Sequence, residues 1–383
     1  MRTATRFIVA TLLAGLVCGA CSKKVELDLT KIAPFENLYT DDEIAKGFVN
    51  LQVAPFGRQD LTFSMLVPKD WRDIQLAIPK EEVAKANEDF IPICRQRAPE
   101  GEPGVPMIEV QVLQLELEVG LTDFVLNYLE SQNLKPLAHN RGVYNGRQVE
   151  DVVIRTIQDK SDFVARMTFS KHGNRMFVVV SSAEASYFMN WAKPYGLAAV
   201  SFTPKQSPQP NVVEELATFV NPGPPYLEFR YPASWTRKDP SNLPPGKVGT
   251  DIVLQSEGKV LGYIHAKAVL KAPELDPNVA IIKLKRDFEN AGVAVGSRLR
   301  LSDLDSKQPA PLAKVEVWKA KQGENDAELA TLVYENASAY YSLGMLIPTR
   351  EQNTMAWMTS WKVFEIVSDD IVKSMSRTTE VAP

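Results

Sequence analysis

The chain has 383 residues, of which 43 are basic and 47 acidic, so its formal charge is −4, and 45% of its residues are apolar. These values exclude a disordered chain, which needs fewer apolar residues and more net charge, and they argue against a nucleic-acid binder, which usually carries a basic excess. Only one apolar run approaches the length that a bilayer requires, so a transmembrane bundle is excluded too. We expect a globular protein of about two domains.

The first twenty residues have the order of an export signal. Arg2 and Arg6 precede an apolar run from Phe7 to Val17, and the small residues Gly19 and Ala20 follow it. A helix over that run would span about half of a bilayer core, at roughly 1.5 Å per residue. We therefore predict that residues 1–20 are a signal peptide that is removed, and not a permanent membrane helix.

The cleavage region, Leu16-Val17-Cys18-Gly19-Ala20-Cys21, resembles the bacterial lipobox, in which small residues precede a cysteine that is acylated, with palmitate among its chains, and becomes the N-terminus. Cys21 takes that role here, and Cys18 stands where leucine is usual. Ser22 resembles the sorting pattern of outer-membrane lipoproteins. The resemblance implies a lipid-anchored protein of the bacterial cell envelope that faces the periplasm. The alternative is ordinary cleavage after Ala20, which gives a soluble exported protein.

The cysteines offer little further chemistry. Cys18 and Cys21 have the spacing of redox and zinc pairs, but they flank the predicted cleavage site. Loss of Cys18 and acylation of Cys21 leave Cys94 as the one thiol, which excludes an intramolecular disulfide. We expect Cys94 to be a small buried core residue.

Two segments are predicted to connect domains. Residues 21–60 contain one short helix, indicated by the capping box Thr40-Asp-Asp-Glu43, and we interpret them as a tether that lets the first domain sit on the order of 30 Å from the membrane. Residues 204–225 hold six prolines around a short apolar segment, Val212 to Val220. We interpret them as a semi-rigid linker; an SH3-type ligand is the alternative.

The blocks on either side of this linker resemble each other. Leu61 to Trp71 aligns with Pro225 to Trp235 at an offset of 164, and in both a strand of period two ends in P-x-x-W. Because Trp71 and Trp235 recur in both copies, we expect them to be core residues; a ligand-stacking role is the alternative.

Both blocks continue with matching elements in the same order. Each is predicted to have a further strand, a helix with an apolar stripe, three strands and a closing helix: Ile108–Leu117 with Val260–Leu270, the helices of Leu121–Leu129 and Ile281–Phe288, Gln148–Thr156 with Ala313–Ala320, Phe163–Phe169 with Leu329–Tyr334, Met176–Ser182 with Tyr340–Ile347, and the helices of Trp191 and Trp357. This predicts an α+β fold, two tandem antiparallel-sheet domains each covered by helices, at residues 61–203 and 226–372, with a tail over 373–383.

This order of elements, with P-x-x-W after the first strand and a closing helix before Ser201-Phe202, resembles the PsbP-like α/β/α sandwich. That family includes an extrinsic photosystem subunit, a nuclear GTPase-binding protein, DcrB-type envelope lipoproteins and Eag-type secretion chaperones. The resemblance covers the first block and, more weakly, the second. It implies a non-enzymatic module that docks other proteins.

Motifs for catalysis are missing from the sequence. It has no H-E-x-x-H, G-x-S-x-G, G-K-[ST] or G-x-G-x-x-G motif, so no catalytic, metal or cofactor residue is predicted. Its three histidines offer no helical pair for zinc. His139 and His172 stand in polar segments that we interpret as turns, and His265 stands in a predicted strand. Adjacent carboxylates point apart and are interpreted as solvated: Asp41-Asp42, Glu81-Glu82, Glu214-Glu215 and Asp369-Asp370.

We therefore expect an envelope protein, anchored by its lipid, that holds an unknown envelope protein partner as an accessory of a secretion or surface complex, without enzymatic activity, cofactor or nucleic acid. Two alternatives remain open. One is a periplasmic small-ligand binder or hydrolase that uses a groove between the domains. The other is a structural spacer between membrane and cell wall.

Overall fold

The computed structural model describes residues 27–32, 35–76, 89–144, 146–158, 161–205, 212–240, 243–271, 277–299 and 315–375. They divide into two compact units: Met1–Glu116 with Leu121–Val213, and Leu117–Gly120 with Glu214–Pro383. The predicted signal peptide lies outside the described residues. Within the described part, no helix has both the length and the apolar run needed to cross a membrane.

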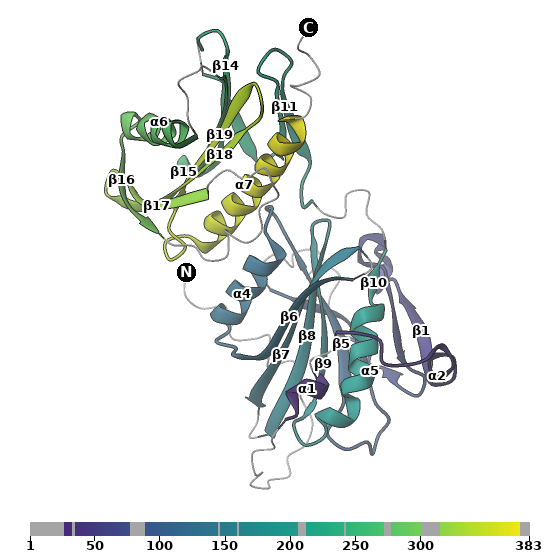
Figure 1. Ribbon diagram of the computed structural model, residues 1–383. Coiled ribbons are helices and arrows are strands. Elements are labelled where there is room, and N and C mark those ends of the chain that lie inside the picture. Colours follow the sequence, from purple (N-terminus) through teal and green to yellow (C-terminus); the bar gives the residue numbers. More distant parts are fainter. Residues whose placement is uncertain are drawn as a thin grey trace. The chain divides into compact units, whose positions relative to one another are not determined.

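The first unit is built on a seven-stranded antiparallel sheet with the strand order β3-β4-β5-β9-β8-β7-β6. Its strands are β3 (Arg72–Asp73), β4 (Ile91–Arg97), β5 (Met107–Gln114), β6 (Pro136–Tyr144), β7 (Arg147–Gln158), β8 (Ser161–His172) and β9 (Arg175–Glu184). One face is covered by α4 (Leu121–Ser131). The other carries α5 (Phe188–Ser201) and a small sheet, as Figure 1 shows. That small sheet consists of β1 (Phe48–Val53), β2 (Phe63–Pro68) and β10 (Thr203–Pro204).

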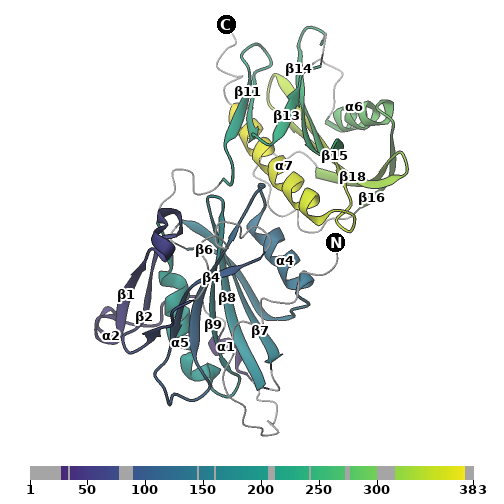
Figure 2. The ribbon, with the colours of Figure 1, turned by 180° about the vertical axis from the view of Figure 1, so that it is seen from behind.

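The second unit has a seven-stranded sheet with the order β13-β14-β15-β19-β18-β17-β16. Its strands are β13 (Trp235–Lys238), β14 (Lys247–Ser256), β15 (Lys259–Leu270), β16 (Val293–Leu299), β17 (Val315–Gln322), β18 (Asn325–Glu335) and β19 (Ala339–Pro348). The helix α6 (Pro277–Asn290) lies on one face. On the other face are α7 (Thr354–Met375) and the hairpin of β11 (Leu216–Asn221) and β12 (Leu227–Pro232) (Figure 2).

The two units therefore share one topology. Strands β3 to β9 of the first sheet correspond, in the same spatial order, to strands β13 to β19 of the second. The helices α4 and α5 correspond to α6 and α7. The prediction of two tandem α+β domains, each with a helix-covered antiparallel sheet, is confirmed.

Alternation along β2 and β12 places their apolar side chains in the two cores. Phe63, Met65 and Val67 of β2 are buried, and so are their counterparts in β12, because every second residue of a strand faces the same side. Trp71 and Trp235 are buried in the two cores, and the Trp71 ring lies edge-on to Trp191 with centroids 5.4 Å apart. The expected core role of both indoles is confirmed.

Part of the segment expected to be a tether belongs to the first unit. Thr40 caps α2 (Asp41–Gly47) with the predicted reciprocal bonds to Glu43, and β1 follows and pairs with β2. Upstream, α1 (Leu29–Ile32) ends on Ile32, whose exposed fraction is 1%. The first unit therefore begins well before residue 61, since these apolar side chains complete its core.

The second unit likewise begins earlier than expected. Within the segment assigned to the linker, β11 pairs with β12 along its length, and the Phe219 ring packs on Phe229 with centroids 5.2 Å apart. The apolar stretch between the proline clusters is thus a strand and not part of a linker.

Candidate functional site

Side chains from four strands form one polar row at an end of the first sheet. Gln114 of β5 is opposite Arg175 of β9, and Arg175 is opposite His172 of β8. Continuing the β7–β8 register by two residues brings Arg147 opposite His172. Two arginines thus flank a histidine on one face of the sheet, an arrangement that like-charge repulsion disfavours unless a counter-charge is supplied.

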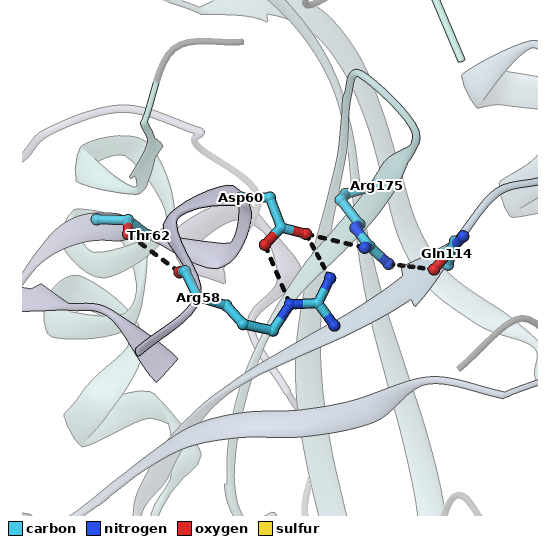
Figure 3. Close-up of polar contacts among 5 residues, drawn as sticks. All are labelled: Arg58, Asp60, Thr62, Gln114 and Arg175. Carbon is cyan, nitrogen blue, oxygen red and sulfur yellow. Dashed lines mark hydrogen bonds and ion pairs between the residues drawn. The ribbon is translucent and has the colours of Figure 1, made fainter. Parts of the chain in front are cut away.

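The counter-charge comes from the loop between β1 and β2. Arg58 donates two hydrogen bonds to the Asp60 carboxylate, from Nε to Oδ1 at 3.0 Å and from Nη2 to Oδ2 at 2.6 Å. Arg175 Nη2 donates a third to Oδ2 at 2.8 Å. Arg175 Nη1 donates to Gln114 Oε1 at 2.8 Å, and the Thr62 hydroxyl donates to the Arg58 carbonyl at 3.3 Å. Figure 3 shows the carboxylate held between the two guanidinium groups. The arrangement is a carboxylate-binding fork built from two arginines.

Burial differs sharply between these groups. The side chain of Arg175 is 7% exposed, that of Arg58 29% and that of Asp60 45%. Arg175 Nε is buried and has no hydrogen-bond partner among the described residues. The carboxylate therefore faces solvent, while the guanidinium behind it is nearly inaccessible.

The pKa values shift accordingly. The hydrogen bond from Arg58 lowers the pKa of Asp60 and raises the pKa of Arg58. Burial lowers the pKa of Arg175, although Asp60 opposes that effect. Burial, with the nearby charge of Arg147, also lowers the pKa of His172, which favours the neutral imidazole.

Further polar groups border the fork, among them the cations Lys205 and Arg147. His172 Nε2 is 2.8 Å from the Lys205 carbonyl, and Lys205 Nζ donates to Gln59 Oε1 at 2.6 Å. Arg147 donates to the Phe202 carbonyl and retains a buried Nη1 without a hydrogen-bond partner among the described residues. This end of the first unit is cationic although the chain as a whole carries a charge of −4.

The second unit, with the same topology, lacks this cluster. At the position of the Gln114–Arg175 pair it has Leu270 opposite Ala339. The loop before β12 spans the five residues 222–226, whereas the loop before β2 spans the nine residues 54–62. The fold itself therefore does not require the arginines or the longer loop.

A second polar pair recurs at an equivalent position in both sheets, with its carboxylate on the opposite strand of the pair. Arg95 of β4 contacts Glu109 of β5, with Arg95 Nε 2.5 Å from Glu109 Oε2. At the equivalent position of the second sheet, His265 Nδ1 of β15 lies 2.7 Å from Asp251 Oδ1 of β14, within hydrogen-bond distance. The side chain of Glu109 is 1% exposed and that of His265 19%, so the two copies present different chemistry at one position.

The three histidines are not brought together. His139 lies in β6, and its Nε2 is 2.5 Å from Glu150 Oε2, so its interpretation as a turn residue was wrong. His172 is the last residue of β8, before the turn at Gly173, whose φ is +58°. His265 lies within β15.

The predicted cysteines have separate outcomes. Cys94 is buried in the first core, as expected, and burial raises the pKa of its thiol to about 12. Cys21, the predicted lipidation site, lies outside the described residues. Among the described residues, no group of three or more His, Cys, Asp or Glu side chains could hold a metal ion.

Reasoning from the sequence missed the arginine fork, because Asp60 and Arg175 are 115 residues apart and belong to a loop and to a strand whose register was unknown. A signal was nevertheless present. Alignment of the two copies places Arg58 and Asp60 where the second copy has only the proline-rich residues 222–225.

No protein-family model matches the sequence, and no curated protein matches it. Solved structures with similarity include a PsbP protein of Synechocystis, with 10% identity over 42% of this chain and 93% of that one, at a TM-score of 0.32. LpqN of Mycobacterium tuberculosis, described as involved in cell envelope biogenesis, has 12% identity over 43% of this chain and 98% of its own, at a TM-score of 0.29. PA94 of Pseudomonas aeruginosa, of unknown function, has 12% identity over 36% of this chain and 99% of its own, also at a TM-score of 0.29.

Proposed function

We propose that this chain is an exported cell-envelope protein, anchored by lipid at Cys21, that docks a partner protein without catalysing a reaction. The order of Arg2, the apolar run from Phe7 to Val17 and Cys21 supports export and acylation. The duplicated fold supports docking, because two linked domains on one anchor bind a partner with an effective concentration that neither would have alone.

The observation that carries the proposal is the placement of the segment that follows Cys21. Leu27 packs against the first core, and the Arg166 guanidinium lies 5.6 Å from the centroid of the Phe35 ring and donates to the Ile32 carbonyl at 3.4 Å. Leu27 is six residues beyond Cys21, and six residues span at most about 20 Å. An acylated Cys21 would therefore keep Leu27 within about 20 Å of the lipid anchor, whereas a free tether of residues 21–60 would let the first domain sit farther away.

The two copies offer unlike surfaces to a partner. The first carries the fork of Arg58 and Arg175, and the second carries the mostly buried pair of Asp251 and His265. Divergence at equivalent positions of one topology is expected when two domains contact different parts of a partner.

The test is affinity purification from detergent-solubilised envelopes of cells that express either the wild-type protein or the Cys21→Ser variant. A defined envelope protein should co-purify in fixed ratio with the wild type and be depleted from the variant, which is not held at the membrane. Recovery of the same proteins at the same level with an unrelated lipoprotein would contradict the docking role.

A further inference from the structure

We infer that the guanidinium groups of Arg58 and Arg175 form a binding site for a carboxylate of the docked partner, and that Asp60 occupies this site as an internal stand-in when the partner is absent. This inference rests on the proposed docking function, because that function supplies the partner whose carboxylate would bind. Carboxylate binding by the two arginines does not itself depend on the lipid anchor.

The geometry of the fork identifies the ligand class. Arg58 approaches both oxygens of one carboxylate with Nε and Nη2, and Arg175 adds a third donor on Oδ2. A planar guanidinium pairs with a planar carboxylate through two parallel hydrogen bonds, which gives orientation as well as affinity. The bound Asp60 therefore shows the shape and charge of the group that the site accepts.

The burial of Arg175 requires a reason that the fold does not supply. Moving a guanidinium out of water costs several kcal/mol, and a partly exposed carboxylate offsets this only in part. Ala339 takes the same place in the second copy and pairs with Leu270 without any charge. The same topology therefore forms with a buried arginine in one copy and an alanine in the other, which is the pattern expected of a residue that binds a ligand and is not needed for folding.

Exposure shows how an outside carboxylate could enter. The side chain of Asp60 is 45% exposed, and its loop carries Phe56 and Gly57 with φ values of +55° and +73°. Lys205 and Gln59 lie exposed beside it. An incoming carboxylate that replaces Asp60 leaves the charge at the two arginines unchanged, because one anion is exchanged for another.

The test measures binding of a fluorescently labelled hexaglutamate peptide to the purified full-length chain by anisotropy at low salt. Asp60→Asn removes the internal competitor while keeping a side chain of similar shape. If Asp60 holds the site about nine-tenths of the time, the variant should bind the peptide about tenfold more tightly than the wild type. Adding Arg58→Gln to Asp60→Asn should abolish that gain.

The second unit provides a matched control. Arg237 and Asp239 have the same spacing in sequence, with Nη2 and Oδ2 2.9 Å apart, but no second arginine meets that carboxylate among the described residues. Asp239→Asn changes the net charge equally and should leave peptide affinity within about twofold of the wild type. Equal gains in Asp60→Asn and Asp239→Asn would show a general charge effect and overturn the inference.

A second peptide distinguishes the source of the carboxylate. Hexaalanine with a free C-terminus carries only a terminal carboxylate, whereas hexaglutamate amide carries only side-chain carboxylates. Tighter binding of either peptide to Asp60→Asn supports the site and identifies which carboxylate it prefers, and binding of neither overturns it. Because the assay needs no acylation, its failure leaves the anchor untouched, and a missing lipid does not affect its result.

Discussion

Trp71 and Trp235 occupy the same place in two copies of one topology, each buried after a P-x-x sequence at the end of β2 or of its counterpart β12. Both indole Nε1 atoms are buried without a hydrogen-bond partner among the described residues. This shared cost indicates that the rings were kept for packing, since a buried donor without a partner is unfavourable. The duplicated architecture makes each copy an internal control for the other.

The buried ion pair of the first unit should be important for stability. Arg166 donates to both oxygens of Asp151 at 2.9 Å, and Thr168 adds a third bond at 2.7 Å. Asp151→Asn removes the charge that compensates a buried guanidinium and should cost about 3 kcal/mol. Calorimetry should show a fall in the melting temperature of the first unit on the order of 10 °C. Asp326→Asn breaks an exposed pair with Lys321 and should cost at most about 0.5 kcal/mol; equal losses would contradict this account.

Close packing of α7 on the second sheet should make Gly262 intolerant of a side chain. A Cβ there would lie 2.5 Å from Ser360 Oγ and 2.8 Å from Trp235 Cη2. We expect Gly262→Ala to cost about 1–3 kcal/mol in urea unfolding, because both neighbours are buried and must shift. Gly142→Ala meets nothing within 4 Å and is the control. An unchanged midpoint for Gly262→Ala would show that α7 packs less closely than described.

Replacement of Glu328 should stabilise the second unit at neutral pH. Burial, and then the charge of Glu351, raise the pKa of Glu328, whose Oε2 accepts a bond from Trp357 Nε1 at 3.1 Å. A raised folded pKa means that stability is greatest when the group is protonated and falls as the pH rises through that value. Glu328→Gln keeps the acceptor and removes the charge, so the gain should be present at pH 7 and vanish below about pH 4. Thermal unfolding across this range checks it; a variant less stable than wild type at pH 7 would refute it.

The thiol of Cys94 should react only when the first unit opens. Its pKa is raised to about 12 by burial, and Gln96 Nε2 is 3.8 Å from its Sγ. The thiolate is the reactive form, so alkylation by iodoacetamide at pH 8 should be negligible in the native protein and complete in concentrated urea. Peptide mass spectrometry measures both. Rapid native alkylation would show that the β4 edge of the core is open.

Apolar alternation and the recurrence of P-x-x-W were enough to predict the fold class and the duplication. Strands β2 and β12 were predicted because Phe63, Met65 and their counterparts alternate regularly. Strand β6 was not, because its sequence around His139 is polar and its position at a sheet edge leaves most side chains in solvent. Strand β1 lies in the segment assigned to the tether; although four of its six residues are apolar, most of its side chains are exposed or only partly buried.

The candidate site was beyond prediction for a different reason. Arg175 and Asp60 carry no local motif, and their contact depends on the β5–β9–β8 register and on the path of the loop before β2. Such registers are set by the packing of whole sheets and not by any short stretch of sequence.

The most direct test of the proposed function is the mass of the mature N-terminus, measured together with detergent phase partitioning for the wild type and Cys21→Ser. The account predicts that the wild type begins at Cys21 with a lipid-sized added mass and enters the detergent phase, and that the variant has neither property. A wild type that begins near Cys21 without lipid and remains in the aqueous phase would contradict the anchor on which the proposed function depends.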